Sequence, residues 1–193
     1  MLEEDRETFY PTSRLEWRQW LTEHHSSKQS VWLIQYKKKS KVATISWSEA
    51  VEEALCFGWV DSKRIPVDEE KFMQFFCRRK AKSTWSKINK DKVQQLINSG
   101  MMTPAGLESI AIAKRNGSWT ILDDVEELRI PSDLDEAFAS LAGSKEYFMS
   151  LSKSVKKMLL QWVVLAKRPD TRQQRINEIA EFASQKLKPK QFR

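Results

Sequence analysis

The fold is decided by residues 58–78, which read Gly58-Trp-Val-Asp-Ser-Lys-Arg-Ile65, then Pro66-Val-Asp-Glu-Glu70, then Lys71-Phe-Met-Gln-Phe-Phe-Cys-Arg78. The first and last of these segments are rich in aromatic and β-branched residues, which favour extended strands. The middle segment is short and polar, as is usual in the link between two neighbouring strands. We therefore predict an antiparallel hairpin over these residues.

The segments around the hairpin predict one further strand and several helices. Residues 31–36, Val-Trp-Leu-Ile-Gln-Tyr, have the same strand character. Ser13 with Glu16, and Ser46 with Glu49, have the spacing of a helix capping box. Further helix starts are expected at Asn89, Thr103-Pro104 and Ser132, and the chain beyond Gly143 is helical almost to its end. The fold class is α+β, with a small mainly antiparallel sheet packed by helices and a helical C-terminal part.

Charge divides the chain into blocks that suggest its domain organisation. The 193 residues carry a net charge of +7, made up of −3 over residues 1–70, +8 over 71–120, −6 over 121–140 and +8 over 141–193. The acidic block is where hydrophobic periodicity is weakest, so a loop or hinge that ends at Pro131 is expected at its start. We expect an α+β body over 1–120, an acidic loop or hinge over 121–131, a helical part over 132–187, and a disordered tail over 188–193.

Several classes of protein are excluded by composition. The two histidines, His24 and His25, are adjacent and the two cysteines, Cys56 and Cys77, are 21 positions apart, so the usual four-ligand zinc spacing is absent. The five scattered glycines form no phosphate-binding loop. We expect no metal, no cofactor and no transmembrane segment, and we expect a cytoplasmic protein because the start is acidic and both thiols lack an evident partner.

A family resemblance rests on motifs that follow one another along the chain. The N-terminal motifs are Ala50-Val-Glu-Glu-Ala-Leu-Cys-Phe-Gly-Trp-Val-Asp61, Arg78-Arg79, Ser83-Thr-Trp-Ser-Lys-Ile-Asn89 and Gly100-Met-Met-Thr-Pro-Ala-Gly106, and the C-terminal one is Ala166-Lys-Arg-Pro-Asp-Thr-Arg172. Together these motifs resemble the YdeI/OmpD-associated family, also called bacteriocin-protection proteins, from about Phe9 to Ala183. Two positions depart from the family pattern, because Ser62 replaces a glycine and Cys77 replaces a proline.

The resemblance implies a role associated with bacteriocin resistance or envelope stress, and the family name implies association with a porin. It implies no catalytic mechanism and no cofactor. We therefore expect a stress-associated binding or interaction protein rather than an enzyme, and name no catalytic residue.

The residues themselves predict an anion-favouring pocket at the end of the hairpin. Asp61 is expected to pair with Arg78 or Arg79 and to fix the orientation of a guanidinium. The following loop adds hydroxyl, amide, lysine and indole groups beside a helix N-terminus, where free N–H groups favour an anion. The ligand-binding residues predicted in this way are Trp59, Asp61, Arg78, Arg79, Trp85, Ser86, Lys87 and Asn89.

Each of these features also has an alternative interpretation. The ion pair of Asp61 serves stability alone, and Ser86 or Asn89 only caps a helix. Basic residues around an exposed Trp85 bind single-stranded nucleic acid through phosphates and base stacking. An enzyme would act on a small anionic metabolite by an unknown reaction. The basic amphipathic helices over residues 152–187 either rest on an anionic membrane or pack on the body, and packing is favoured.

The eight tryptophans are expected to fall into two groups. Those on apolar stripes are expected in the core, and those beside glycines, loops or charges are assigned no preference between core and surface. The first group is Trp17, Trp20, Trp32, Trp47 and Trp162, and the second is Trp59, Trp85 and Trp119.

Overall fold

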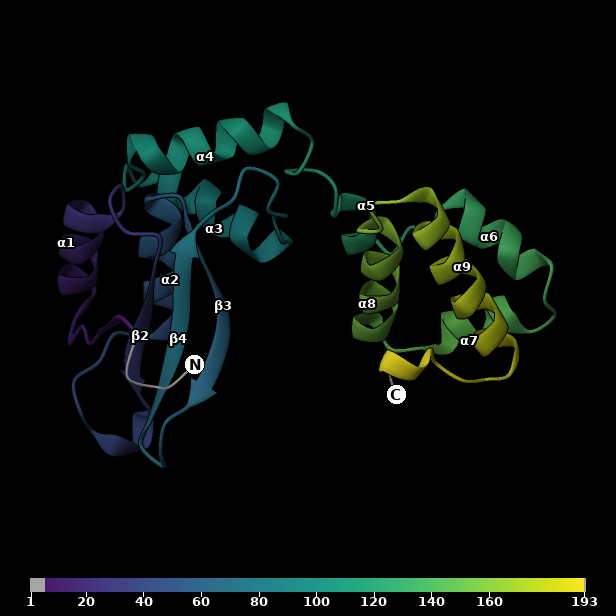
Figure 1. The fold of residues 1–193 in the computed structure, drawn as a ribbon, viewed down its shortest axis with the longest axis horizontal. Helices are drawn as coiled ribbons and strands as arrows, with labels where there is room; N and C mark the ends of the chain where they lie inside the picture. The colour runs from purple at the N-terminus through teal and green to yellow at the C-terminus, as the bar shows by residue number, and fades with distance from the viewer. Residues whose placement is uncertain (1–5, 193) are drawn as a thin grey trace. The chain divides into compact units, whose positions relative to one another are not determined.

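A computed structural model describes residues 6–192, so the acidic start at residues 1–5 and the last tail residue, Arg193, lie outside the described residues. The chain forms two compact units, Met1–Trp119 and Thr120–Arg193. The first combines a sheet with helices and the second is helical, which confirms the predicted α+β class (Figure 1).

The sheet of the first unit has four strands in the order β1-β2-β4-β3. The predicted hairpin is confirmed, because β3 and β4 pair antiparallel and Trp59 lies opposite Arg78. β2 pairs antiparallel with β4, while β1 adds a short parallel edge that sequence reasoning missed because it contains only two residues. The strands are β1 (Thr8–Phe9), β2 (Ser30–Tyr36), β3 (Trp59–Pro66) and β4 (Lys71–Arg78).

Helices of the first unit begin where polar side chains satisfy free backbone N–H groups. Ser13, Ser46 and Thr103 each cap a helix, as expected. The helix expected to start at Asn89 begins earlier, at Lys87. Its cap is Ser86, whose hydroxyl accepts a hydrogen bond from the backbone N–H of Asn89. The helical segments are α1 (Arg14–His24), the 3-10 turn η2 (Lys38–Ser40), α2 (Trp47–Cys56), α3 (Lys87–Asn98) and α4 (Pro104–Arg115).

Only some of the tryptophans expected in the core lie there. Trp17 is fully buried as predicted, but Trp47 is 42% exposed at the first position of α2. Trp59 and Trp85 are both buried in the core. Trp59 is buried because its strand position places it on the same side of the sheet as Phe76, which faces the helices.

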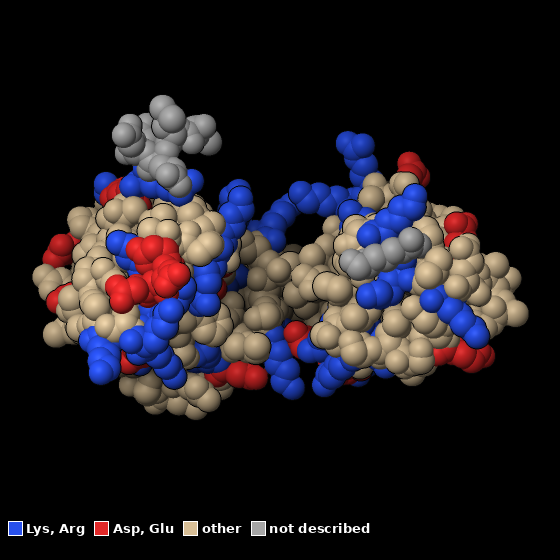
Figure 2. Space-filling view, turned by 90° about the horizontal axis from the view of Figure 1, so that it is seen from below, with Lys and Arg blue, Asp and Glu red and all other residues tan. Residues whose placement is uncertain are grey.

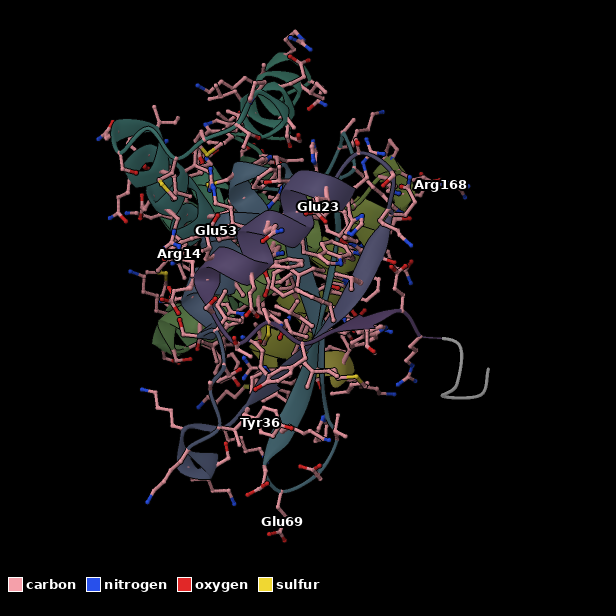
Figure 3. All side chains as sticks on the ribbon, turned by 90° about the vertical axis from the view of Figure 1, so that its left-hand side faces the viewer. Arg14, Glu23, Tyr36, Glu53, Glu69 and Arg168 are labelled. Atoms are coloured by element: carbon pink, nitrogen blue, oxygen red, sulfur yellow. The ribbon has the colours of Figure 1, made fainter. Side chains whose placement is uncertain are left out.

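A buried ion pair joins α1 to α2. The carboxylate of Glu53 is fully buried and accepts hydrogen bonds from Arg14 Nε at 2.5 Å and from Arg18 Nη1 at 2.6 Å. Figure 3 shows Arg14 beside Glu53, whereas Glu23 lies near the other end of α1. A second guanidinium nitrogen of Arg18 donates to the carbonyl of Met101, which attaches the segment before α4 to the same cluster.

The second unit buries the apolar stripes of its helices in a core of its own. The segment 121–131, expected as a loop or hinge, contains a short helix because Leu122 and Val125 are buried in that core. Within the expected tail, Phe192 packs on the same core. The helical segments are α5 (Asp123–Glu126), α6 (Ser132–Ala139), α7 (Ser144–Ser150), α8 (Lys153–Val164), α9 (Pro169–Ser184) and the 3-10 turn η3 (Lys190–Phe192).

The surface and the helix lengths bear on the predicted partners. Among residues 6–192, no helix has the length and apolar content needed to cross a bilayer. Of the apolar residues in the C-terminal amphipathic helices, Leu159, Val163 and Ile176 are buried in the second core, whereas Met158 is 43% exposed. On the face shown in Figure 2, Lys and Arg form separate groups interrupted by Asp and Glu, so basic charge is local.

Replacing Glu53 by glutamine is expected to lower the free energy of unfolding by about 3 kcal/mol, because it leaves the facing arginines without their buried counter-charge. Urea denaturation of the variant measures this loss. The control is Glu23→Gln on α1, whose side chain is exposed and whose loss is expected to stay within about 0.5 kcal/mol. An equal effect of both substitutions would contradict the structural role of Glu53.

Candidate functional site

A cleft of about 350 Å³ lies at the end of β4, where Arg78 and Arg79 leave the sheet. Its walls come from segments that are far apart in sequence. Besides the two arginines, the end of α1 contributes His25 and Ser26, and the turn between α2 and β3 contributes Phe57 and Gly58. The loop after β4 contributes Ala81, and α4 contributes Ala105, Glu108, Ser109 and Ile112.

Two glycines let the walls of the cleft approach one another. Gly58 has a positive φ of 72°, which allows the sharp turn from α2 into β3. A Cβ atom on Gly106 would lie 2.2 Å from the carbonyl oxygen of Cys56, so only glycine permits this contact of α4 with the end of α2. Thr103 reinforces the contact, because its hydroxyl donates to the same carbonyl at 2.6 Å.

Arg79 is the most unusual group of the cleft. Its guanidinium carbon lies 3.7 Å from the ring centroid of Trp85, and Nη1 donates to the carbonyl of Thr84 at 2.8 Å. Its Nε and Nη2 are buried and have no acceptor among the described residues, and the same holds for Nε1 of Trp85. Burial lowers the pKa of the Arg79 guanidinium to about 10, although the charge of Asp61 opposes that shift. Three buried donors therefore lie unsatisfied in one stacked pair.

The other polar and charged groups of the cleft lie nearer its surface. Arg78 is exposed, and its Nη1 is 3.4 Å from the carbonyl of Ser26, which makes a long hydrogen bond. His25 is oriented by a 2.9 Å hydrogen bond between Nδ1 and the carbonyl of Leu21. Glu108 is the acidic lining residue, and Arg115 pairs with it at 2.8 Å. The cleft thus combines two guanidinium groups with one carboxylate that already has a cationic partner.

The ion pair predicted for Asp61 is not formed. Its Oδ2 accepts hydrogen bonds from Trp47 Nε1 at 3.0 Å and from Gln74 Nε2 at 3.2 Å instead. The reason is register, because the backbone of Arg79 bonds to Gly58, three residues along β3 from Asp61. At a strand rise of roughly 3.3 Å per residue, the two side chains start about 10 Å apart.

The structure brings two of the eight predicted residues, Arg78 and Arg79, into the cleft lining and places Trp85 beneath one of them. Trp59 is buried in the core, and its Nε1 donates to the carbonyl of His25. The remaining residues of the predicted set belong to α3 and its cap, outside the lining, and are Ser86, Lys87 and Asn89.

Sequence reasoning missed the groups that close the cleft from α1 and α4. His25, at the end of α1, lines the cleft, although the sequence assigned the adjacent histidines no ligand-binding role. Glu108 and Ser109 have no local motif that marks them. No group of three or more His, Cys, Asp or Glu side chains that would hold a metal occurs in residues 6–192.

The fold and the cleft define the first unit as a small α+β domain with an arginine-lined cavity. Residues 9–109 match the family described as a domain of unknown function, DUF8412, and the chain belongs to this family. Residues 127–186 match the family described as bacteriocin-protection, YdeI or OmpD-associated. No curated protein and no solved structure matches the chain.

The predicted family is therefore confirmed for part of the chain. The expected extent from Phe9 to Ala183 is larger than the match. The N-terminal motifs that suggested it lie within residues 9–109, which match the other family. All lining residues of the cleft except Ile112 lie in that first region, and none lies in residues 127–186, so the name of the second family describes residues outside the cleft.

The C-terminal motif has a structural role in the second unit. Arg172 lies in α9 and binds Asp133 of α6 through Nε at 2.7 Å and through Nη2 at 2.9 Å. Its Nη1 also reaches the carbonyl of Val163 at the end of α8. These contacts hold the pKa of Asp133 below its ordinary value, chiefly through the hydrogen bonds from Arg172. One arginine thus connects three helices.

Arg172→Met is expected to destabilise the second unit by about 1.5 kcal/mol at pH 6, a moderate cost because the ion pair is about one-third exposed. Since the pKa of Asp133 is lowered on folding, the contribution of the ion pair is present above the unfolded pKa near 3.9. It is lost as the pH falls through the folded pKa.

The difference between the wild-type protein and Arg172→Met should therefore shrink at pH 3. Urea unfolding followed by fluorine NMR of 5-fluorotryptophan reports on this unit through Trp162, its single tryptophan. Arg168→Met, at an exposed position, is the control. A difference that is independent of pH would contradict this role for the ion pair.

Proposed function

We propose that this protein binds a small oxyanion, a carboxylate or a phosphate group, in the cleft of Arg78 and Arg79. The single observation that carries this proposal is the buried guanidinium of Arg79, whose Nε and Nη2 have no acceptor among the described residues. These two nitrogens form one side of the planar guanidinium fork, the side that binds carboxylate or phosphate through two parallel hydrogen bonds.

Energetics support a ligand at this position. A buried donor without an acceptor costs about 1–3 kcal/mol, and the cost is higher for a charged group. An oxyanion would satisfy two donors of Arg79 and neutralise its charge, with Nε1 of Trp85 as a third donor of the same stacked pair. Because protein atoms cover these nitrogens, binding includes a side-chain shift that opens the fork to the cleft.

The surroundings of the cleft favour binding over catalysis. Cys56 and Cys77 each directly precede a lining residue, and desolvation raises the pKa of both thiols, so both are poor nucleophiles at neutral pH. The ring of His25 is engaged through Nδ1 with a backbone carbonyl. No pair of nucleophile and base is therefore assigned to the cleft.

The compartment and the cellular role belong to the same proposal. Cys56 and Cys77 are free thiols, which suits the reducing cytoplasm. The family name of residues 127–186 suggests bacteriocin protection. We propose that role for this protein, with the first unit supplying ligand recognition. The alternative of nucleic-acid binding at Trp85 is not supported, because its indole is only 1% exposed.

Inorganic phosphate and acetate are the probes for the cleft. Either anion, if it binds, is expected to raise the free energy of unfolding by about 2.7 kcal/mol at 100 times its dissociation constant. Arg79→Met is expected to abolish this response. Without anion its stability should stay within about 1 kcal/mol of wild type, because loss of an unpaired buried charge offsets loss of the stack on Trp85.

The control is Arg129→Met, an exposed arginine of the second unit, which should keep the full response. Arg79→Lys retains the charge without the fork and should weaken anion binding. This variant replaces Arg79→Met in the test if Arg79→Met fails to fold. A wild-type protein that does not respond to either anion, or an Arg79→Lys variant that responds equally, would refute the proposal.

A further inference from the structure

The sheet of the first unit has a second apolar face, defined by strand register. Trp32 of β2 lies opposite Phe75 of β4, and Ile34 of β2 lies opposite Met73 of β4. On the neighbouring strand β3, Ile65 also lies opposite Met73. Partners in a register share one face of the sheet. We call this the open face, and its apolar members are Trp32, Ile34, Val60, Ile65, Met73, Phe75 and Cys77.

The open face takes no part in the core of the unit. The alternate residues Val31, Leu33 and Phe76 pack with the helices, whereas no apolar member of the open face belongs to that core. In Figure 1, α2 lies behind the sheet and no labelled helix of the unit lies in front of it. Each apolar member of the open face keeps partial exposure. Two central strands therefore present uncovered apolar side chains.

Two aromatic rings occupy the middle of the open face. The ring centroids of Trp32 and Phe75, on the neighbouring strands β2 and β4, lie 5.0 Å apart with an angle of 57° between their planes. The guanidinium carbon of Arg6 lies 5.5 Å from the centroid of the Trp32 ring. Rings on adjacent central strands, spaced in this way, form a surface on which planar groups stack.

The charged groups around these rings are cationic. Lys71 lies opposite Tyr36 on this side of the sheet, and Lys63 belongs to the exposed irregularity of β3 between Asp61 and Arg64. Asp68 pairs with Lys71 at 3.7 Å, while no carboxylate occupies a register position on the described open face. Positive charge beside the aromatic surface thus comes from Arg6 over the Trp32 ring, from Lys71 with its partner Asp68, and from Lys63 in the irregularity of β3 next to Phe75.

We propose that the open face binds single-stranded nucleic acid, with bases stacked on Trp32 and Phe75 and phosphates bound by Arg6, Lys63 and Lys71. Stacking on aromatic side chains together with basic groups along the backbone is how single strands are bound without a sequence code. The cations favour a nucleic acid over an apolar peptide or a second copy of this face, because neither of these would bring negative charge to the lysines and arginine. This site is distinct from the cleft and from the basic loop around Trp85.

Fluorescence anisotropy of labelled ten-residue oligo(dT) and oligo(rU) tests the proposal with the full chain. Binding of at least one strand is expected at 50 mM salt, with an affinity about tenfold lower at 200 mM because up to three phosphates are neutralised. Trp32→Leu and Phe75→Leu keep apolar volume but remove a stacking ring, and each should weaken binding about tenfold. The matched control is Trp47→Leu, an exposed tryptophan on α2, which should bind like wild type.

Further variants separate this site from the other two. Arg79→Met should bind the oligonucleotides unchanged, so failure of the anion cleft and failure of the open face are distinguishable. Retention of full affinity by both Trp32→Leu and Phe75→Leu would overturn the proposal. So would a loss confined to the pair Lys82→Gln and Lys87→Gln, which would place binding on the basic loop.

Two remaining outcomes also overturn it. One is the absence of binding to either strand at 50 mM salt. The other is a dimer in light scattering that Trp32→Leu dissociates while neither strand binds, since the open face would then be an interface between copies of this chain. A thermal unfolding midpoint of Trp32→Leu equal to that of the wild type shows that the variant is folded, so that the binding affinities can be compared.

Discussion

The carboxylate of Glu53 is the buried charge on which the arrangement of the first unit depends. Taking a carboxylate out of water is costly, and the cost is recovered only when its partners are held in good geometry. Arg14 and Arg18 supply those partners from one face of α1, so the position of α1 on α2 is fixed by charge as well as by apolar packing. Arg18 extends the constraint to the carbonyl of Met101.

The same constraint positions the cleft. Glu53 lies one turn before the end of α2, and the carbonyl of Cys56 at that end receives the hydroxyl of Thr103. Gly106 then passes so close to this carbonyl that no side chain fits. The wall formed by α4 is therefore placed by the end of α2, and the walls formed by α1 and α2 are joined through Glu53. Arg79 enters a space whose shape is set elsewhere in the unit.

Local chemistry explains which parts of this structure were predictable. The hairpin and the caps at Ser46 and Thr103 depend on neighbouring residues, and their patterns were sufficient. Burial of Trp59 and exposure of Trp47 depend on which face of the sheet the helices cover, and alternation along a strand does not determine that. For the same reason, the prediction that Trp32 lies in the core was wrong.

The candidate site follows the same division. Adjacent arginines beside a strand end were visible in the sequence, and the structure brings Arg78 and Arg79 into the cleft. Their predicted partner Asp61 fails because a strand extends its residues, so three positions are enough to separate two charges. The actual neighbours Ser26 and Glu108 come from segments about 50 residues before and 30 residues after the arginines, and only tertiary packing brings them together.

The two units also differ in what they leave unsatisfied. In the second unit the motif arginine Arg172 is fully used in connecting helices, and most of the apolar residues of α8 and α9 are buried. In the first unit the guanidinium of Arg79 has donors without acceptors, and the ring of Trp32 lies outside the core. Folding alone gives no reason to keep a buried donor unpaired or an aromatic pair uncovered, because both cost free energy. A ligand that binds to each recovers that cost, which is why recognition is assigned to the first unit.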